Sequence, residues 1–354
     1  MAEERIRVDA QKLRKLAALE LQAVGVPEQD SEVMADVLVT ADLRGVETHG
    51  IVSLVAFYIN GIQEGRINPK PEIKITETGA ATATIDGGHG LGYAVTYRAM
   101  NKAIELAGKA GAGFVTVKNS THYGPGFYYP MMALEHDMIG IALTNSPVPE
   151  VVPPGSTKIA VGTNPLSVAA PSNKQYPFVL DMATAVVAAG KFRKAILEEK
   201  PIPEGWAIDK NGKPITDPNQ RKPDNGGILP LGGKPELGVF KGFGLGVMID
   251  IFTAILTGSA PAIFQKEKGT CHFVGAFNIG NFIPVDTFKN RMDEMIEAYN
   301  VLPKLPGVKD IYIAGGYEAK VQAEREANGI PLLKKVIDTL QETAEKLGVE
   351  YSLV

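Results

Sequence analysis

The sequence has a single cysteine, Cys271, among its 354 residues, so no disulfide can form within the chain, as in proteins of reducing compartments. No 18 consecutive residues are apolar, and the start, "MAEERIRVDAQKLRK", lacks the apolar segment of a secretory signal. The net charge of −4, without a polybasic run, argues against nucleic acid or an anionic membrane as the main partner. We therefore expect a soluble, cytoplasmic protein.

Several common signatures of catalysis are also missing. The near misses "GGHGLG" (87–92) and "GKAGAG" (108–113) do not have the G-x-G-x-x-G spacing of a Rossmann dinucleotide turn. Neither a Walker A lysine motif nor a G-x-S-x-G nucleophile elbow occurs. The histidines, at positions 49, 89, 122, 136 and 272, form no H-E-x-x-H or H-x-H pattern, so we expect no metal site.

Helical spacing dominates the first 65 residues. A helix within 9–26 has Asp9 as its N-cap, although Glu20 interrupts the apolar face. That face consists of Leu13, Leu16, Ala17, Leu21 and Val24. A second helix is predicted over 27–45 and a third apolar run covers 51–62, after which 71–88 alternates and breaks at Gly79 like a hairpin.

From about residue 93 helical and strand patterns alternate, which predicts a sheet covered by helices, an α/β fold. Helices are expected at 93–111, 127–137, 185–198 and 243–256, and strands at 113–119, 139–145, 164–172 and 176–184. Residues 200–235 are rich in proline, glycine, asparagine and aspartate, which indicates a structured excursion near the functional site. Two or three helices end the chain, the last over 331–348.

Two histidines stand at turns. "RGVETHG" places Arg44, Glu47, Thr48 and His49 between two helices, and "NSTHYGPG" places His122 between a strand and a helix. Ligands of such sheets lie beyond the carboxyl ends of strands, and histidine exchanges protons near neutral pH. Each histidine could instead be a hydrogen-bonded structural residue, the reading we favour for those at positions 89, 136 and 272.

Two charged residues lie in apolar surroundings. Asp181 in "PFVLDMATA" is expected at a strand end, where it could bind a ribose or amide or cap the following helix. Lys241 in "FKGFGLGVMIDIF" opens an apolar helix, where a phosphate would suit both the lysine and the helix N-terminus. The lysine could also extend into solvent.

These residues belong to an ordered series of blocks that resembles the malate/L-lactate (and sulfolactate) dehydrogenase family, which also includes ureidoglycolate dehydrogenase, diketogulonate reductase and cyclic-imine reductases. The resemblance covers about residues 10 to 350. The blocks are "ADLRGVETHG", "VKNSTHYGPGFYYPMMA", "IALTNSP", "GTNPLSVAAP", "FVLDMATA", "IPEGWAIDKNGKPITDP", "LPLGG" and "FKGFGLGVMIDI".

The resemblance implies a non-Rossmann mixed-sheet α/β core covered by helices, with a helical segment built from both chain ends. We accordingly expect a mainly helical segment from 1–75 and 286–354, and a cofactor- and substrate-binding domain over 76–285. The family uses NAD or NADP for reversible hydride transfer between a 2-hydroxy acid and a 2-oxo acid, and its members are homodimers. The same resemblance therefore explains why the glycine fingerprint is missing.

The resemblance also implies roles for individual residues. His122 and His49 are the candidates for proton transfer, with His122 favoured as the group that meets the hydroxyl. Arg44 and Thr48 are candidates for substrate binding. The cofactor-binding candidates are His122, Tyr123, Gly124, Ser146, Asp181, Met182, Ala183, Lys241, Gly315 and Glu318.

Two departures from the family pattern concern the substrate and the cofactor. The family commonly has an arginine four residues after the first histidine and a tyrosine four further on, where this chain has Ser53 and Phe57. Either another cation, Arg44 or Lys158, binds the substrate carboxylate, or the substrate is a different 2-oxo acid or a cyclic imine. A non-catalytic nucleotide-binding protein is the third reading. The segment 313–319, "IAGGYEA", departs from the family's P-G-E-x-E and weakens the cofactor assignments there.

Overall fold

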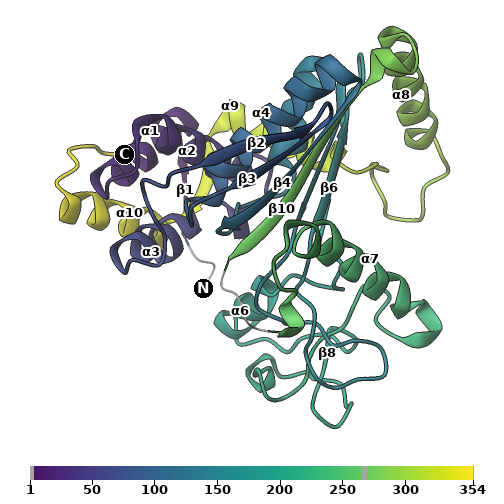
Figure 1. Ribbon diagram of the computed structural model, residues 1–354. Coiled ribbons are helices and arrows are strands. Elements are labelled where there is room, and N and C mark those ends of the chain that lie inside the picture. The colour runs from purple at the N-terminus through teal and green to yellow at the C-terminus, as the bar shows by residue number, and fades with distance from the viewer. Residues whose placement is uncertain (1–3, 265–268, 354) are drawn as a thin grey trace.

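The computed structural model describes residues 4–264 and 269–353, and its centre is a twisted mixed sheet (Figure 1). The sheet has seven strands in the order β2-β3-β4-β10-β5-β6-β7. The fold class expected from the sequence is therefore confirmed. The strand bounds are β2 Lys74–Gly79, β3 Thr82–Asp86, β4 Ala112–Ser120, β5 Met138–Thr144, β6 Leu166–Ala170, β7 Phe178–Met182 and β10 Thr270–Asn278.

The strand directions bring several chain segments to one edge of the sheet. Strands β4 and β5 are both antiparallel to β10, and β7 is separated from β5 by two antiparallel pairings. Since β3 is parallel to β4, strands β3, β4, β5 and β7 all point the same way. Their carboxyl ends share an edge, where β6 and β10 begin, and the segments around His122, Ser146 and Asp181 leave the sheet there.

Helix α4 (Gly92–Ala110) covers the sheet over β4 and β10. Its Ala99 and Ala103 are buried with Val115 and Val274, so small residues on the helix meet branched residues of the strands. Gly113 permits this close approach, because a Cβ atom there would lie 2.1 Å from the carbonyl oxygen of Ala103. After β4 the chain turns into α5 (Tyr128–Met132), which a 3₁₀ turn, Ala133–His136, continues.

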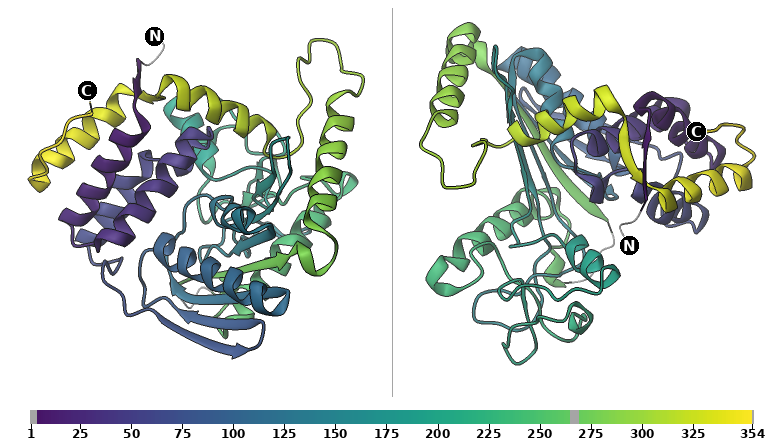
Figure 2. Two further views of the ribbon diagram at one scale, coloured as in Figure 1. Left: turned by 90° about the horizontal axis from the view of Figure 1, so that it is seen from above. Right: turned by 180° about the vertical axis from the view of Figure 1, so that it is seen from behind.

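The chain ends meet in a helical lobe beside the sheet (Figures 1 and 2). Helix α1 (Ala10–Ala23) packs on α2 (Glu28–Leu43) and on α10 (Lys334–Leu347). Strand β1 (Arg5–Val8) pairs with β11 (Ile330–Leu333), so the two ends of the chain are hydrogen-bonded. Helix α9 (Gly316–Asn328) and the short α3 (Asn60–Gln63) complete the lobe.

A second lobe lies below the sheet in Figure 1 and is built mainly from residues between β7 and β10, with the segment between β5 and β6 packed into its core. Its apolar core includes Phe192, Ile202, Ile215 and Ile228. The elements are α6 (Gly190–Leu197), β8 (Ala207–Ile208), β9 (Gly227–Ile228) and α7 (Val239–Phe252). The proline- and glycine-rich stretch 200–235 is the middle part of this lobe.

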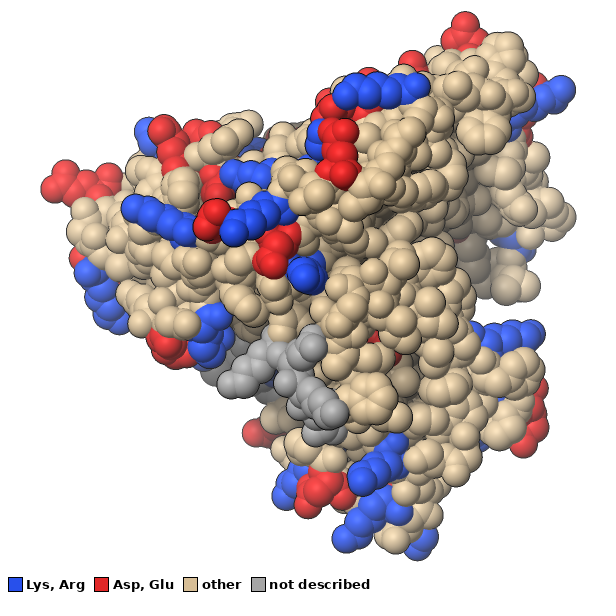
Figure 3. All heavy atoms as spheres, in the orientation of Figure 1, with Lys and Arg blue, Asp and Glu red and all other residues tan. Residues whose placement is uncertain are grey.

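Helix α7 and the 3₁₀ turn after it, Val239–Thr257, are long and apolar enough by length and composition to cross a membrane. In the fold, however, Ile249 of this helix packs with Leu143 and Phe273 of the sheet. Asp250 on the same helix accepts a hydrogen bond from Asn164. The opposite face is exposed, and Figure 3 shows few charged side chains over the region of α7.

Helix α8 (Val285–Asn300) lies at the far end of the sheet, away from the helical lobe (Figures 1 and 2). Asp293 fixes it there, because its carboxylate accepts the backbone N–H groups of Asn173, Lys174 and Gln175. The helical lobe therefore draws its C-terminal part from α9, β11 and α10. The division of the chain into two domains stays a prediction.

Other differences concern strands that local periodicity does not reveal. Residues 331–333 read as the start of the last helix but belong to β11, because they pair with β1. The expected helix over 185–198 begins only at Gly190, since Ala185 pairs with Pro230 and the next four residues are irregular. Strand β10, at the centre of the sheet, is almost continuously buried and therefore has no alternating pattern.

Candidate active site

His122 lies two residues beyond β4, at the edge where the carboxyl ends of the strands meet. Its Nδ1 is 2.6 Å from the hydroxyl oxygen of Tyr58 and 3.3 Å from the backbone nitrogen of Gly124. The hydroxyl of Tyr93 in turn donates to that of Tyr58 over 2.8 Å. A chain of two buried tyrosines thus ends on one nitrogen of the half-buried imidazole.

This arrangement sets the tautomer of the neutral ring. Because the Tyr58 oxygen accepts from Tyr93, its own proton points to Nδ1, and the Gly124 N–H points there too. The ring proton is then on Nε2. Surrounding protein and the nearby His49 lower the pKa of His122 to about 3, so the free protein holds this imidazole neutral.

His49 lies against His122, with ring centroids 5.7 Å apart and an interplanar angle of 23°. It ends the 3₁₀ turn Glu47–His49, and the hydroxyl oxygen of Thr48 is 3.0 Å from its Nδ1. Burial lowers the pKa of His49 below the ordinary histidine value. The two histidines that the sequence picks out as proton-transfer candidates are therefore brought together, and Thr48 contacts one of them.

A π-helical turn, Leu54–Ile59, decides which aromatic residue meets His122. Such turns insert an extra residue into a helix and are frequent at functional sites. Tyr58 is buried by this turn and contacts Nδ1, whereas Phe57 is 45% exposed and packs edge-on to the imidazole at 5.7 Å. Tyr58 thus supplies a tyrosine beside His122, although the family position, 57, holds phenylalanine.

Asp181 lies at the end of β7, as expected, but it caps a different helix from the one that follows it. Its carboxylate accepts the backbone N–H groups of Phe127, over 2.9 Å, and of Gly126, just before α5. The side chain is open to solvent although protein surrounds it closely, and these surroundings raise the pKa of Asp181 to about 6. Met182 and Ala183 follow it and are half-buried.

Arg44 is buried, with 4% of its surface exposed. Its guanidinium lies 5.0 Å from the centre of the Phe127 ring and donates to the side-chain oxygen of Gln322 over 3.0 Å. Asp181 and Glu318 are its electrostatic neighbours. The cofactor candidates Asp181 and Glu318 are thus close to Arg44. Because Arg44 is buried, little of its guanidinium is accessible to a substrate carboxylate.

Gly315 brings the start of α9 against the first residues of β7. The carbonyl oxygen of Ala314 accepts the Val179 N–H of β7 over 3.0 Å, and a Cβ atom on Gly315 would lie 2.8 Å from that nitrogen. Its φ of +94° also favours glycine. Although segment 313–319 departs from the family pattern, it retains Gly315, which this close approach requires.

Ser146 and Lys241 lie on the side of the second lobe. Asn164 ties this region together: its side-chain oxygen accepts the Ser146 N–H, and its amide nitrogen donates to Gly246 and Asp250 of α7. Lys241 is exposed in the first turn of α7, and among residues 4–264 and 269–353 it has no ion-pair partner. An unpaired cation thus stands at a helix N-terminus that no side chain caps.

A second layer supports the His122 turn. Tyr123 stacks on His272 with ring centroids 4.8 Å apart and an angle of 1°. His272 is fully buried, and its nitrogens bond the hydroxyls of Thr144 (2.8 Å) and Ser120 (2.9 Å). This is the hydrogen-bonded structural histidine expected from the sequence. No group of three potential metal ligands occurs in the described part of the chain.

Sequence reasoning missed Tyr58, Tyr93 and Asn164 as supporting residues. Each makes its decisive contact with a residue far along the chain, so local sequence carries no signal for the pairing. For Asn164 the sequence did carry one signal, the "GTNP" block, which is typical of a turn. In the structure Asn164 has a φ of +36°, which is unusual for a residue other than glycine.

Comparison with known proteins agrees with this geometry. The profile of the malate/L-lactate dehydrogenase family matches residues 8–341. The chain is 43% identical to malate dehydrogenase of Pyrococcus abyssi, over 98% of this chain and 97% of that protein. It is 39% identical to L-sulfolactate dehydrogenase of Methanocaldococcus jannaschii, over 95% and 96% of the two chains.

The solved structures give the same answer. Malate dehydrogenase from Pyrococcus horikoshii superposes with a TM-score of 0.87 at 40% identity, covering 98% of this chain and 97% of that one. The matches span nearly the whole of each protein, so fold and sequence agree from end to end. The chain therefore belongs to the malate/L-lactate dehydrogenase family, a family of enzymes that oxidise and reduce small acids with a nicotinamide cofactor.

Proposed function

We propose that this protein is an NAD- or NADP-dependent dehydrogenase of a small 2-hydroxy acid, malate- or lactate-like, with His122 as the proton-transfer residue. The observation that carries the proposal is the Tyr93–Tyr58–His122 chain of hydrogen bonds beside the stacked His49. Such a chain orients one imidazole, which a general acid or base requires.

The residues present fit a nicotinamide nucleotide. Lys241 and the uncapped start of α7 offer positive charge for a phosphate, and the accessible carboxylate of Asp181 can accept ribose hydroxyls. Ser146 and the turn His122 to Gly124 follow the carboxyl ends of β5 and β4. Glu318 is an electrostatic neighbour of Asp181, and Gly315 holds the start of its helix against β7. When bound, the nucleotide would supply or accept the hydride. No feature of these residues selects NAD over NADP.

Within this chain, His122 handles the proton. In the reducing direction the imidazolium form of His122 donates its Nε2 proton to the 2-oxo oxygen as the hydroxyl forms, and the ring is left neutral with its proton on Nδ1. In the oxidising direction that tautomer takes the proton back at Nε2. The negative charge of a bound 2-oxo acid raises the pKa of His122 from its low value, so the imidazolium becomes available in the complex. Tyr58 serves each state, because its hydroxyl donates to Nδ1 of the resting ring and accepts from Nδ1–H once that nitrogen carries the proton.

The substrate end of the site departs from the family pattern. Ser53 cannot hold a carboxylate as an arginine does, and Phe57 presents an apolar ring beside His122. Arg44 is buried against Phe127 and Gln322, whereas Lys158 is exposed and in that respect is the more available of the two proposed cations. A different 2-oxo acid or a cyclic imine is the alternative substrate class that Ser53 and Phe57 favour.

We also propose a homodimer in the cytoplasm. The exposed face of α7 and the turns after it carries large apolar side chains, too many for a surface in water alone. They are Phe240, Ile251, Phe252, Ile255, Leu256, Ile263 and Phe264. The single cysteine, buried in β10, suits a reducing compartment. Sedimentation equilibrium would measure the mass; a monomer at micromolar concentration would contradict the dimer.

The test of function is the absorbance at 340 nm of NADH or NADPH with oxaloacetate, pyruvate, sulfopyruvate, larger 2-oxo acids and cyclic imines. We expect turnover with at least one acid, and His122→Ala should lower kcat by about a hundredfold or more. Nucleotide binding without turnover on the whole panel would favour a non-catalytic nucleotide-binding protein. If neither nucleotide binds, the proposal fails.

A further inference from the structure

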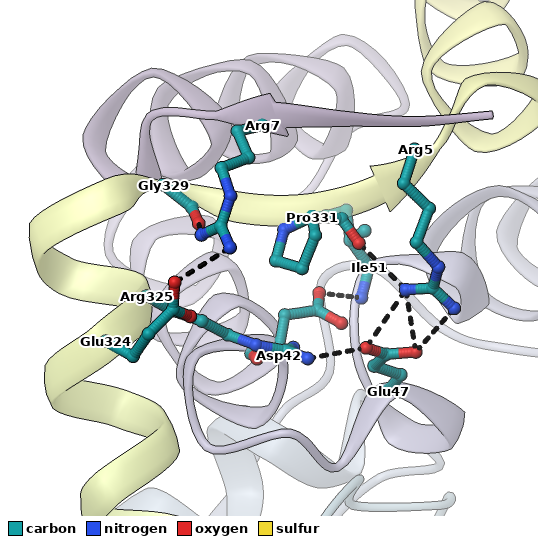
Figure 4. A network of polar contacts seen from close by, with 9 residues as sticks. All are labelled: Arg5, Arg7, Asp42, Glu47, Ile51, Glu324, Arg325, Gly329 and Pro331. Carbon is teal, nitrogen blue, oxygen red and sulfur yellow. Dashed lines mark hydrogen bonds and ion pairs between the residues drawn. The ribbon is translucent and has the colours of Figure 1, made fainter.

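The turn that carries His49 is held at both ends by residues outside the site (Figure 4). It spans Glu47 to Ile51, between the end of α2 and the π-helical turn. One end bonds to α2, and the other to β1 and α9. His49 lies between the two fixed points, so its ring position depends on both.

The first fixed point is the carboxylate of Asp42, which is 1% exposed. It accepts the backbone N–H of Ile51 over 2.7 Å. The turn lies so close that a Cβ atom on Gly50 would come within 2.1 Å of this carboxylate, so glycine is required there. The residue after His49 is therefore pressed directly onto the buried end of α2.

The second fixed point is Glu47, at the start of the turn. Arg325 of α9 donates to Glu47 Oε1 over 2.7 Å with one nitrogen and to the backbone carbonyl of Asp42 with another. The Arg325 side chain is 12% exposed, so solvent weakens this pair only partly. Arg5 of β1 adds longer contacts of 3.3 Å to the same carboxylate.

We infer that Arg325 is a positioning residue for His49, acting through Glu47 and Asp42. It is the one described side chain that bonds both Glu47 and the end of α2, and it thereby fixes the angle at which the turn leaves the helix. The inference rests on the proposed role of His49 beside His122. A displacement of about 1 Å in such a group is enough to slow catalysis about a hundredfold.

The same helix offers a matched control. Glu324, the neighbour of Arg325, pairs with Arg7 over 2.7 Å and so also joins α9 to β1. That pair does not touch the His49 turn (Figure 4). If ion pairs of the chain ends matter only for stability, breaking either pair should have similar consequences. If Arg325 positions His49, only its loss should affect catalysis.

The experiment compares Arg325→Gln, Arg325→Lys, Glu47→Gln, the double variant Arg325→Gln/Glu47→Gln and the control Glu324→Gln in the full chain. We expect Arg325→Gln to lower kcat about tenfold or more while the KM of the nucleotide changes less than twofold. Arg325→Lys, which keeps the charge on a single donor nitrogen, should restore part of the rate. The double variant should be no slower than the slower single variant, since both single changes remove the same Arg325–Glu47 pair.

A second readout does not depend on activity. In proton NMR, the His49 ring resonance, assigned with His49→Gln, should shift and titrate closer to the ordinary histidine range in Arg325→Gln but not in Glu324→Gln. Equal loss of kcat in Arg325→Gln and Glu324→Gln, or an unmoved His49 resonance, would overturn the inference. A parent protein without any turnover would refute the proposed function alone, because the resonance still tests the positioning of His49.

Discussion

The hydroxyl oxygen of Tyr58 lies 2.6 Å from Nδ1 of His122, a contact that joins residues 64 positions apart. It exists because a π-helical turn directs Tyr58 inward and leaves Phe57 outward beside the imidazole. The tyrosine that orients His122 is thus Tyr58, and it reaches the imidazole because the π-helical turn inserts one extra residue into the helix.

Tyr58→Phe removes this hydroxyl and keeps the ring. We expect kcat/KM to fall about tenfold, the value of roughly one neutral hydrogen bond, with the nucleotide KM unchanged. Initial rates in both directions measure the effect, and Phe57→Leu is the control for loss of ring packing. An unchanged rate in Tyr58→Phe would mean that Gly124 alone sets the tautomer.

Asp181 predicts a pH dependence of nucleotide binding. Since its pKa is raised to about 6, the carboxylate is ionised at pH 8 and becomes protonated as the pH falls toward 5. Affinity for the nucleotide should therefore weaken below about pH 6, because a protonated carboxyl is a poorer acceptor for ribose. Fluorescence titration with NADH from pH 5 to 8 measures this. Asp181→Asn, which cannot titrate, should bind weakly at every pH with a flatter profile.

Glu20 predicts a stabilising substitution. It is fully buried in α1, neither carboxylate oxygen has a partner in the described structure, and burial raises its pKa from 4.5 to about 8. The folded state binds this proton more tightly than the unfolded state, so the associated stability is present at low pH and lost as the pH rises toward 8.

Glu20→Leu removes that loss, and its free energy of unfolding at pH 8 should exceed that of the parent by about 1–3 kcal/mol. The advantage should shrink as the pH falls to 5. Urea unfolding at both pH values measures it, with the exposed Glu32→Leu on α2 as the control. A destabilised Glu20→Leu at pH 8 would show that the site cannot accommodate the branched side chain.

Ser53→Arg tests what binds the substrate carboxylate. If the site acts on short 2-oxo acids without an optimal cation, the new guanidinium should raise kcat/KM for oxaloacetate about tenfold or more through a bidentate contact. Ser53→Gln controls for size without charge. No gain with oxaloacetate, together with turnover of a larger acid or a cyclic imine, would instead assign the altered substrate class to Ser53 and Phe57.

The amino-acid sequence by itself determined the local elements and the chemistry of the turns. The apolar faces of α1 and α4, the hairpin of β2 and β3, and the placement of His122 and Asp181 at strand ends follow from short-range patterns. The ordered blocks were sufficient to identify the family, because each block combines turn residues with polar groups in a pattern typical of one kind of site. Glu20, visible as a break in an apolar face, proved to be a buried carboxyl.

Only the tertiary structure decided which distant residues meet. The pairing of β1 with β11, the central place of β10, the choice of Tyr58 over Phe57 and the hold of Arg325 on Glu47 all join segments that local periodicity treats separately. Asp181 illustrates the physical reason: its carboxylate serves the helix whose free N–H groups lie nearest in space, at Phe127, and not the helix that comes next in the chain. Local propensity fixes an element, but packing fixes its partners.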